Sequence, residues 1–249
     1  MSKQTPTPPP TNSNQATSGI SYLDSGGTHP PLLCLHGIQG SKESFSFLLN
    51  SPLARQARLI IPDIPGFGAS HAPSDCVFDL DQQAERLVDF IDEVKIKRVI
   101  VYGHSLGGML GTLLLEKIPD RITGLISSEG NLSLEDCGES RRVVEIDFDE
   151  FEATRYPELK KRGVSTSAVS FYSTARSVVQ LSKSGRLFTV LANSPRPVLF
   201  IRGGASHFKS VPVGDNVRNV EIANETHFTL PGSRGSIDIV TSFFSELCG

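Results

Sequence analysis

The sequence has no run of clustered lysines and arginines. Among its 249 residues, 24 basic side chains stand against 27 acidic ones, and the formal net charge is -3 at pH 7. Binding to the phosphate backbone of a nucleic acid depends on clustered basic groups. The balanced and scattered charge therefore excludes nucleic acid as an expected partner, and it is typical of an ordinary globular protein.

Long apolar runs are also missing. Residues 1–14 consist mostly of Ser, Thr, Gln, Asn and Pro and contain no apolar block of the kind that a signal peptide needs. The most apolar of the long uncharged stretches, 99–115, is interrupted by His104, Ser105 and several glycines, so it makes a poor membrane span. We therefore expect no membrane segment. We expect residues 1–18 to form a disordered tail, because they cannot bury enough apolar surface to fold.

Cysteine is scarce, and its spacing fits no metal site. Cys34, Cys76, Cys137 and Cys248 lie in different segments, with no CxxC pair among them. Scattered cysteines of this kind are typical of reduced thiols in a cytoplasmic protein. The sequence thus predicts a cytoplasmic protein without a metal ion or cofactor, and it leaves the oligomeric state open.

Short apolar runs alternate with helical patterns along most of the chain. A continuous apolar run such as 31–35 is typical of a strand buried in a parallel sheet. Apolar residues recur with helical spacing in 79–94 and again in the last segment, around Ile237 and Phe244. This alternation predicts an α/β fold with a mostly parallel sheet covered by helices on both faces. The expected strands are 19–24, 31–35, 59–61, 98–102, 122–127, 198–201 and 217–222.

One connection is far longer than a loop. The segment 132–193, of about 60 residues, lies between the strand at 122–127 and the strand at 198–201, where roughly 2–6 residues are usual. We predict that this connection contains a helical cap, residues 132–193. The remaining segments, 19–131 and 194–249, then form a single core, since a chain of this length favours one core with an insertion over two full domains.

The strongest chemical signal is a G-x-S-x-G pattern around Ser105. The pattern runs from Gly103 to Gly107 and lies between an apolar run and a helical segment. A serine at the tip of a strand-to-helix turn adopts a strained backbone, and the two glycines avoid collisions with the neighbouring strand and helix. Ser105 is therefore the expected nucleophile. A phosphate-binding loop is excluded, because the Gly-Lys-Ser/Thr that it requires is absent.

With this turn and four further motifs in the same order, the sequence resembles the α/β-hydrolase fold family. The likeness extends from about residue 19 to residue 247 and implies the fold of that family, with a helical cap insertion. It does not identify the substrate. The further motifs are HGIQG at 36–40, which resembles the oxyanion loop, DIPGFGAS at 63–70, PVLFIRG at 197–203, and NETHF at 224–228, which resembles the loop with the catalytic histidine.

A serine hydroxyl needs a base to become a nucleophile at neutral pH. His227 is the expected base, since it follows the strand at 217–222 and precedes the last helix, in the family's chain order of nucleophile, acid and base. His207 is an alternative, because it lies beside the strand at 198–201, near the usual place of the acid.

The acid of the triad is missing from its usual place. Most of the family carries an Asp a few residues past the strand at 198–201, where Ser206 stands here, and a serine cannot stabilise an imidazolium. Some relatives, including haloalkane dehalogenases, place the acid one strand earlier. Glu129 follows the strand at 122–127 and is therefore predicted as the acid, with Asp215, or no acid at all, as the alternatives.

Backbone donors and cap side chains complete the predicted site. The N–H groups of Ile38 and Leu106 are expected to form the oxyanion hole. Aromatic side chains of the insertion are expected to line the substrate pocket, namely Phe148, Phe151, Phe171 and Tyr172.

Together these residues predict a capped serine hydrolase that acts on a small to medium hydrophobic ester or lactone. The predicted mechanism uses a Ser-His-Glu triad and an acyl-enzyme intermediate. Ser105 excludes the chemistry of dehalogenases and epoxide hydrolases, which need a nucleophilic Asp. A carbon–carbon bond hydrolase with the same triad, an acyltransferase, and a non-catalytic receptor for a small molecule remain as alternatives.

Overall fold

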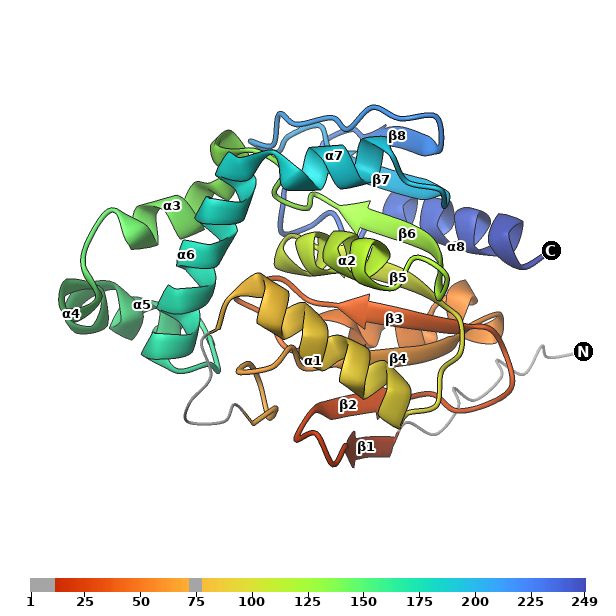
Figure 1. Cartoon of the computed structure of the whole chain (residues 1–249), viewed down its shortest axis with the longest axis horizontal. Helices are drawn as coiled ribbons and strands as arrows, with labels where there is room; N and C mark the ends of the chain where they lie inside the picture. Colours follow the sequence, from red (N-terminus) through yellow and green to blue (C-terminus); the bar gives the residue numbers. More distant parts are fainter. Residues whose placement is uncertain (1–11, 72–77) are drawn as a thin grey trace, which may run out of the picture.

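The computed structural model describes residues 12–71 and 78–249, and its centre is an eight-stranded sheet (Figure 1). The strands are β1 (Asn12–Gln15), β2 (Ser21–Asp24), β3 (Pro31–Leu35), β4 (Arg58–Pro62), β5 (Val99–His104), β6 (Ile122–Ser128), β7 (Val198–Gly203) and β8 (Val217–Ile222). Their order in the sheet is β1-β2-β4-β3-β5-β6-β7-β8. The strands from β4 to β8 in this order are parallel, whereas β1 and β2 pair antiparallel. The predicted α/β fold with a mostly parallel sheet is confirmed.

Two apolar layers cover the sheet, one on each face. In β3, Leu33 and Leu35 belong to one layer, while Leu32 and Cys34 belong to the other, because successive residues of a strand point to opposite faces. Both sets are completely buried. Strands covered on both faces are apolar without alternation, which explains the continuous apolar runs. Helices α1 (Leu80–Glu93) and α2 (Leu106–Lys117) contribute to the first layer; η1 (Lys42–Asn50), η2 (Pro52–Arg55) and α8 (Arg234–Cys248) contribute to the second.

The prediction that residues 1–18 form a disordered tail is wrong for the second half of this segment. Within the predicted tail of 1–18, residues Asn12–Gln15 form β1, which pairs along its whole length with β2. Ala16 is buried in the first apolar layer. An edge strand satisfies its backbone by pairing on one side and needs few apolar side chains, so composition alone did not reveal it. Residues 1–11 of the predicted tail lie outside the described residues.

The segment between β6 and β7 is helical. Figure 1 shows α3, α4 and α5 beyond the carboxyl ends of β3 and β6, and α6 running from this group back toward the sheet. Helix α7 packs against α2. The segment predicted as a cap, 132–193, therefore contains the helices that project beyond the sheet and also α7, which packs with α2 over the sheet. The elements are η3 (Leu134–Cys137), α3 (Gly138–Val144), α4 (Phe148–Glu150), the π-helical η4 (Phe151–Arg155), α5 (Tyr156–Lys161), α6 (Ala168–Ser184) and α7 (Arg186–Ala192).

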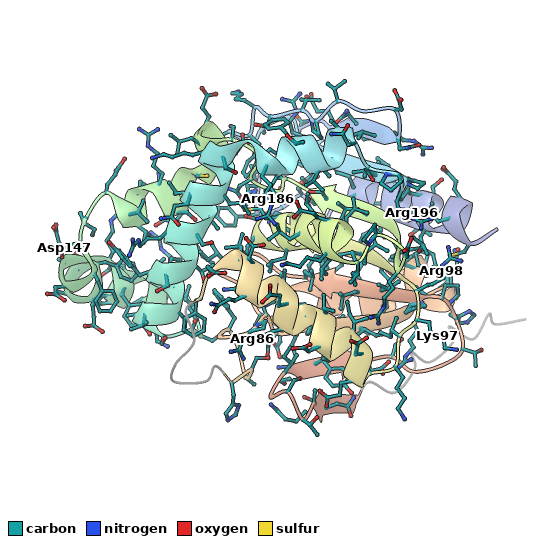
Figure 2. All side chains as sticks on the ribbon, in the orientation of Figure 1. Arg86, Lys97, Arg98, Asp147, Arg186 and Arg196 are labelled. Atoms are coloured by element: carbon teal, nitrogen blue, oxygen red, sulfur yellow. The ribbon has the colours of Figure 1, made fainter. Side chains whose placement is uncertain are left out.

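Arg186, at the start of α7, links this segment to the core helices (Figure 2). Its guanidinium donates to both carboxylate oxygens of Asp81 in α1, at 2.7 and 2.9 Å, and to Glu116 in α2 at 3.0 Å. These hydrogen bonds hold the pKa of Asp81 below its usual value. One forked cation thus joins three helices, an arrangement for which the geometry of arginine is suited.

Candidate active site

Ser105 lies at the turn between β5 and α2. Its backbone has φ 54° and ψ -115°, a conformation that residues with a side chain seldom adopt. A Cβ on Gly103 would lie 2.1 Å from the carbonyl oxygen of Gly107, and a Cβ on Gly107 would lie 1.9 Å from that of Leu35. Both distances are far below van der Waals contact. The predicted reason for a glycine at each of these two positions is confirmed.

The hydroxyl of Ser105 is bound to an amide that the sequence did not single out. Ser105 Oγ donates to Oδ1 of Asn131 at 3.3 Å. Asn131 is buried, and its Nδ2 donates to the backbone carbonyl of Asp136 at 2.9 Å, which fixes the orientation of the amide. A sequence signal existed, since Asn131 lies in the same short segment as Glu129.

Two backbone N–H groups near Ser105 are available to a ligand. Gly37 lies against the nucleophile, since a Cβ on it would be 3.5 Å from Cβ of Ser105, and Ile38 follows it on the wall of the same cavity. Leu106 is the first residue of α2, and the first N–H groups of a helix have no partner within it. Among the described residues, neither Ile38 N–H nor Leu106 N–H has a hydrogen-bond acceptor. Free N–H groups at a helix start attract anions.

Glu129 follows β6 directly and is completely buried. Its Oε2 lies 2.6 Å from Nδ1 of His227 and accepts a hydrogen bond from Ser206 Oγ at 3.0 Å. Its Oε1 accepts from the N–H of Gly203 at 2.8 Å. The structure thus brings together Glu129 and His227, which are 98 positions apart in the sequence. Ser206, which stands where the sequence analysis looked first for an acid, thus donates to the carboxylate that contacts His227.

Asp215 lies at the wrong edge of the sheet to contact His227. It precedes β8, which runs parallel to β7 with Val217 opposite Val198. Asp215 is therefore beside the amino ends of these strands. Ser105 and His227 follow carboxyl ends, where Glu129 also lies. The alternative in which Asp215 is the acid is wrong, because a parallel sheet separates the two ends of each strand.

The ring of His227 packs against other rings. Phe208 stacks on it with 4.7 Å between the ring centroids and 11° between the planes, and His104 lies 4.5 Å away. His207 is more distant, at 6.0 Å. His104 donates from Nδ1 to the carbonyl of Ser128 at 3.1 Å. Burial, together with the nearby His227, holds the pKa of His104 well below its usual value, so this ring is neutral near pH 7.

Ser105 and His227 line a cavity of about 1020 Å³. Its wall includes apolar side chains from the core, among them Ile38, Phe45 and Phe208. The exposed ring of Phe228 lies on the same wall. A cavity of this size accommodates a small to medium organic molecule.

The cap aromatics that were predicted to bind substrate do not line this cavity. Phe151 and Phe171 are completely buried, with their ring centroids 6.0 Å apart. Tyr172 packs against Phe151 at 5.4 Å and against Phe148 at 5.5 Å. The prediction that Phe148, Phe151, Phe171 and Tyr172 bind substrate is therefore wrong. A small helical unit needs its large apolar side chains for its own core, and these four supply it.

Two polar residues stabilise the loops beside the site. His36 donates from Nδ1 to the carbonyl of Gly37 at 2.8 Å and accepts from the N–H of Ile64 at Nε2, at 3.0 Å. Asp63 is completely buried and accepts from Nζ of Lys42 at 2.8 Å. Both side chains thus hold loop conformations, and neither lies where it would transfer a proton to Ser105.

The cavity wall includes a cysteine thiol, which is a poor nucleophile at neutral pH. Cys137 lines the wall, and burial raises the pKa of its thiol, so the thiol is protonated at neutral pH.

Over residues 12–71 and 78–249, no three His, Cys, Asp or Glu side chains are placed to hold a metal ion. Within the same ranges, no helix has the length and apolar character needed to cross a membrane.

Comparison with known proteins relates this chain to hydrolases. A family model described as the alpha/beta hydrolase fold matches residues 30–206. An uncharacterised hydrolase of Saccharomyces cerevisiae is 34% identical over 44% of this chain and 38% of that protein. Haloalkane dehalogenase 2 of Mycobacterium tuberculosis is 31% identical over 43% of this chain and 37% of that protein. The matched segment spans well under half the length of either relative.

A solved structure shares the fold over nearly the whole chain. N-acyl homoserine lactonase AidH, complexed with N-butanoyl homoserine, aligns with 96% of this chain and 97% of its own, at a TM-score of 0.76. The two sequences are 19% identical, so the likeness is one of fold.

Gly107→Ala is expected to destabilise the protein by about 3 kcal/mol or more, because the backbone must move to make room for a methyl group beside the carbonyl of Leu35. The measurement is the free energy of unfolding in urea. Gly232→Ala is the matched control, since nothing lies within 4 Å of a Cβ at that position. It should change the free energy by less than about 1 kcal/mol. Equal stability of the two variants would contradict this account of the turn.

Stability is expected to fall as the pH drops below about 6.5. Burial holds the pKa of His36 and of His104 below the usual value. As the pH falls, these two side chains are therefore protonated in the unfolded chain before they are protonated in the folded protein. The stabilisation is fully present above the pKa of the unfolded chain and is lost as the pH falls toward the pKa of the folded state. Each histidine contributes at most about 1.4 kcal/mol per pH unit.

Urea unfolding of the wild type and of His104→Gln over this pH range measures the effect. The slope of the free energy against pH should be smaller in the variant. His29→Gln, at an exposed position, is the control and should keep the slope of the wild type. Identical slopes for wild type and His104→Gln would show that His104 titrates normally in the folded protein.

Proposed function

This chain belongs to the α/β-hydrolase fold family, and on that premise we propose that it is a serine hydrolase of small to medium hydrophobic esters or lactones. The observation that carries the proposal is the 2.6 Å contact between Glu129 and Nδ1 of His227, beside the cavity that contains Ser105. A carboxylate at Nδ1 holds the ring proton there and leaves Nε2 of the neutral ring free to accept one. A serine nucleophile requires such an acceptor.

In the acylation step, Oγ of Ser105 attacks the carbonyl carbon of the substrate while its proton passes to Nε2 of His227. The negative charge that develops on the carbonyl oxygen is stabilised by the N–H groups of Ile38 and Leu106. The loss of one such donor costs about 3 kcal/mol in comparable sites. His227 then gives the proton to the leaving oxygen, and the bond between this oxygen and the carbonyl carbon breaks.

In the second step, water replaces the departed group. A water proton passes to His227, the water oxygen attacks the acyl carbon, and the tetrahedral oxyanion uses the same two N–H groups. Its collapse breaks the bond to Ser105, which recovers its proton from His227. Glu129 stabilises the imidazolium formed in each step, and its hydrogen bonds from Gly203 and Ser206 keep the carboxylate oriented toward His227.

Asn131 holds the nucleophile in a resting position. Among the described residues, Ser105 Oγ has its hydrogen bond with Asn131 and none with His227. The hydroxyl of Ser105 must therefore exchange Asn131 for His227 as its partner before its proton can be transferred. We propose that a bound substrate brings about this exchange, since a carbonyl carbon placed near Ile38 and Leu106 attracts the oxygen of Ser105.

The same hydrogen bond favours a second candidate, a non-catalytic receptor for a small molecule. A serine that stays bound to Asn131 is not activated by His227, and the cavity then serves for binding alone. The two candidates differ in the reactivity of Ser105, which can be measured without knowledge of the natural substrate.

A fluorophosphonate probe is expected to label the wild type at Ser105, because the probe reports a serine activated by a neighbouring base. Ser105→Ala should remain unlabelled. Ser140→Ala is the matched control, since Ser140 is buried on the wall of the same cavity, and it should be labelled like the wild type. A wild type that resists the probe, or equal labelling of Ser105→Ala, would favour the receptor.

Glu129→Gln is expected to lower kcat for a p-nitrophenyl ester by about 10²- to 10⁴-fold. The glutamine oxygen can still accept from Gly203, but its NH₂ group donates to Nδ1 of His227. The ring proton then resides on Nε2, where it blocks proton transfer from Ser105. The free energy of unfolding should change little by comparison, because the side chain keeps its shape.

Glu225→Gln is the control for this variant. It makes the same chemical change in the loop that carries His227, away from Nδ1, and kcat should stay within about twofold of the wild type. If Glu129→Gln turned over esters as fast as Glu225→Gln, Glu129 would not be the acid of the triad.

A further inference from the structure

Arginines from the cap reach the cavity that contains Ser105. Arg142 of α3 and Arg162, which follows α5, both line its wall, together with Glu139. A second cavity, of about 530 Å³, shares these three residues and adds Arg155. Two hollows of the protein surface thus meet at one cluster of cap side chains, Glu139, Arg142, Arg155 and Arg162, which we call the cap arginine cluster.

The cap arginine cluster carries more positive than negative charge. Its acid, Glu139, lies 2.6 Å from Arg142 and 3.7 Å from Arg155. Arg162 has no ion pair among the described residues. Glu158, which lines the second cavity, pairs with Lys161 at 2.7 Å. The cap arginine cluster thus has three guanidinium groups and one carboxylate, that of Glu139. The carboxylate of Glu158 does not add to this balance, because it pairs with Lys161 outside the cluster.

The other acids near the cavity are already hydrogen-bonded within the protein. Asp136 is buried and accepts backbone N–H groups from Ser133 at one oxygen and from Lys209 at the other, at 3.1 and 3.0 Å. Glu129 is committed to His227. Among the described residues, neither of these carboxylates forms an ion pair with an arginine of the cap arginine cluster.

We propose that the substrate carries a carboxylate on the part that contacts the cap, and that Arg162 and Arg142 bind it. This inference rests on the proposed function, in which Ser105 attacks the carbonyl at the other end of the same molecule. The planar fork of a guanidinium matches a carboxylate with two parallel hydrogen bonds. The apolar wall at Ile38, Phe45 and Phe208 suits the hydrocarbon that connects the two ends.

The proposal narrows the substrate class to esters or lactones of a hydrophobic chain that ends in a carboxylate. Because both arginine side chains are exposed, the attraction is screened by salt and is expected to weaken as the ionic strength rises. A substrate preference that fell with salt would thus agree with an anion site made of exposed arginines.

The first experiment compares p-nitrophenyl hemiesters of dicarboxylic acids, from succinate to suberate, with neutral p-nitrophenyl esters of the same chain length. We expect kcat/KM for at least one hemiester to exceed that of its neutral counterpart by about tenfold or more, mainly through a lower KM. Added salt should reduce this ratio. Hemiesters that are no better than neutral esters at every length would overturn the proposal.

Substitutions in the cap arginine cluster test whether the preference for hemiesters depends on these arginines. Arg162→Ala should lower the ratio of hemiester to neutral ester several-fold without breaking an ion pair, and Arg162→Lys should restore part of it. Arg141→Ala is the matched control, because Arg141 precedes Arg142 on the same helix but pairs with Glu145 at 3.4 Å and does not line either cavity. An equal loss in Arg141→Ala would assign the effect to net charge rather than to this site.

A binding measurement separates this proposal from the proposed catalytic function. Calorimetric titration of Ser105→Ala with adipate or suberate should detect binding that is weakened at least several-fold by Arg162→Ala in the same background. If no ester is cleaved but this binding occurs, the anion site stands and the hydrolase proposal fails. If esters are cleaved but Ser105→Ala and its Arg162→Ala derivative bind the diacids equally or not at all, the anion site is refuted.

Discussion

The carboxylate of Glu129 joins segments that are distant in the sequence. It lies at the end of β6, accepts hydrogen bonds from Gly203 at the end of β7 and from Ser206 in the following loop, and contacts His227 beyond β8. A buried carboxylate is costly unless its oxygens are well bonded, so these loops are confined to one arrangement. The orientation of the His227 ring follows from that arrangement and is reinforced by stacking on Phe208.

Close approach of backbones makes this arrangement possible. A Cβ on Gly203 would lie 2.3 Å from the carbonyl oxygen of Glu225, so glycine at this position allows the loop with His227 to reach Glu129. Gly107 likewise has no side chain that would collide, and it allows the first turn of α2 to approach the backbone of Leu35 in β3. Ser105 is thereby held beside free N–H groups, and Arg142 and Arg162 of the cap arginine cluster line the same cavity. The site combines a rigid reacting end with a charged and more exposed cap end.

Much of the fold and part of the site could be predicted from local sequence patterns. The continuous apolar strands report a sheet covered on both faces, and the glycines around Ser105 report a turn with no room for side chains. The cap aromatics show the limit of such patterns. Phe151 and Phe171 are apolar residues in a helical segment, and nothing local distinguishes a ring that faces a cavity from one that faces a neighbouring helix. Strand β1 was missed for a related reason, since its stability comes from pairing with β2.

The sequence by itself determined the α/β fold, the turn with Ser105, and the order of the loops that carry polar residues to one edge of the sheet. Only the tertiary structure decided which carboxylate meets His227. Glu129 and Asp215 both stand beside strands, but in a parallel sheet one lies at the carboxyl edge and the other at the amino edge. It also decided that Asn131 binds the hydroxyl of Ser105 and that Arg142 and Arg162 share a cavity with it. Such contacts depend on how whole elements pack, and periodicity and spacing along the chain do not encode the directions in which those elements meet.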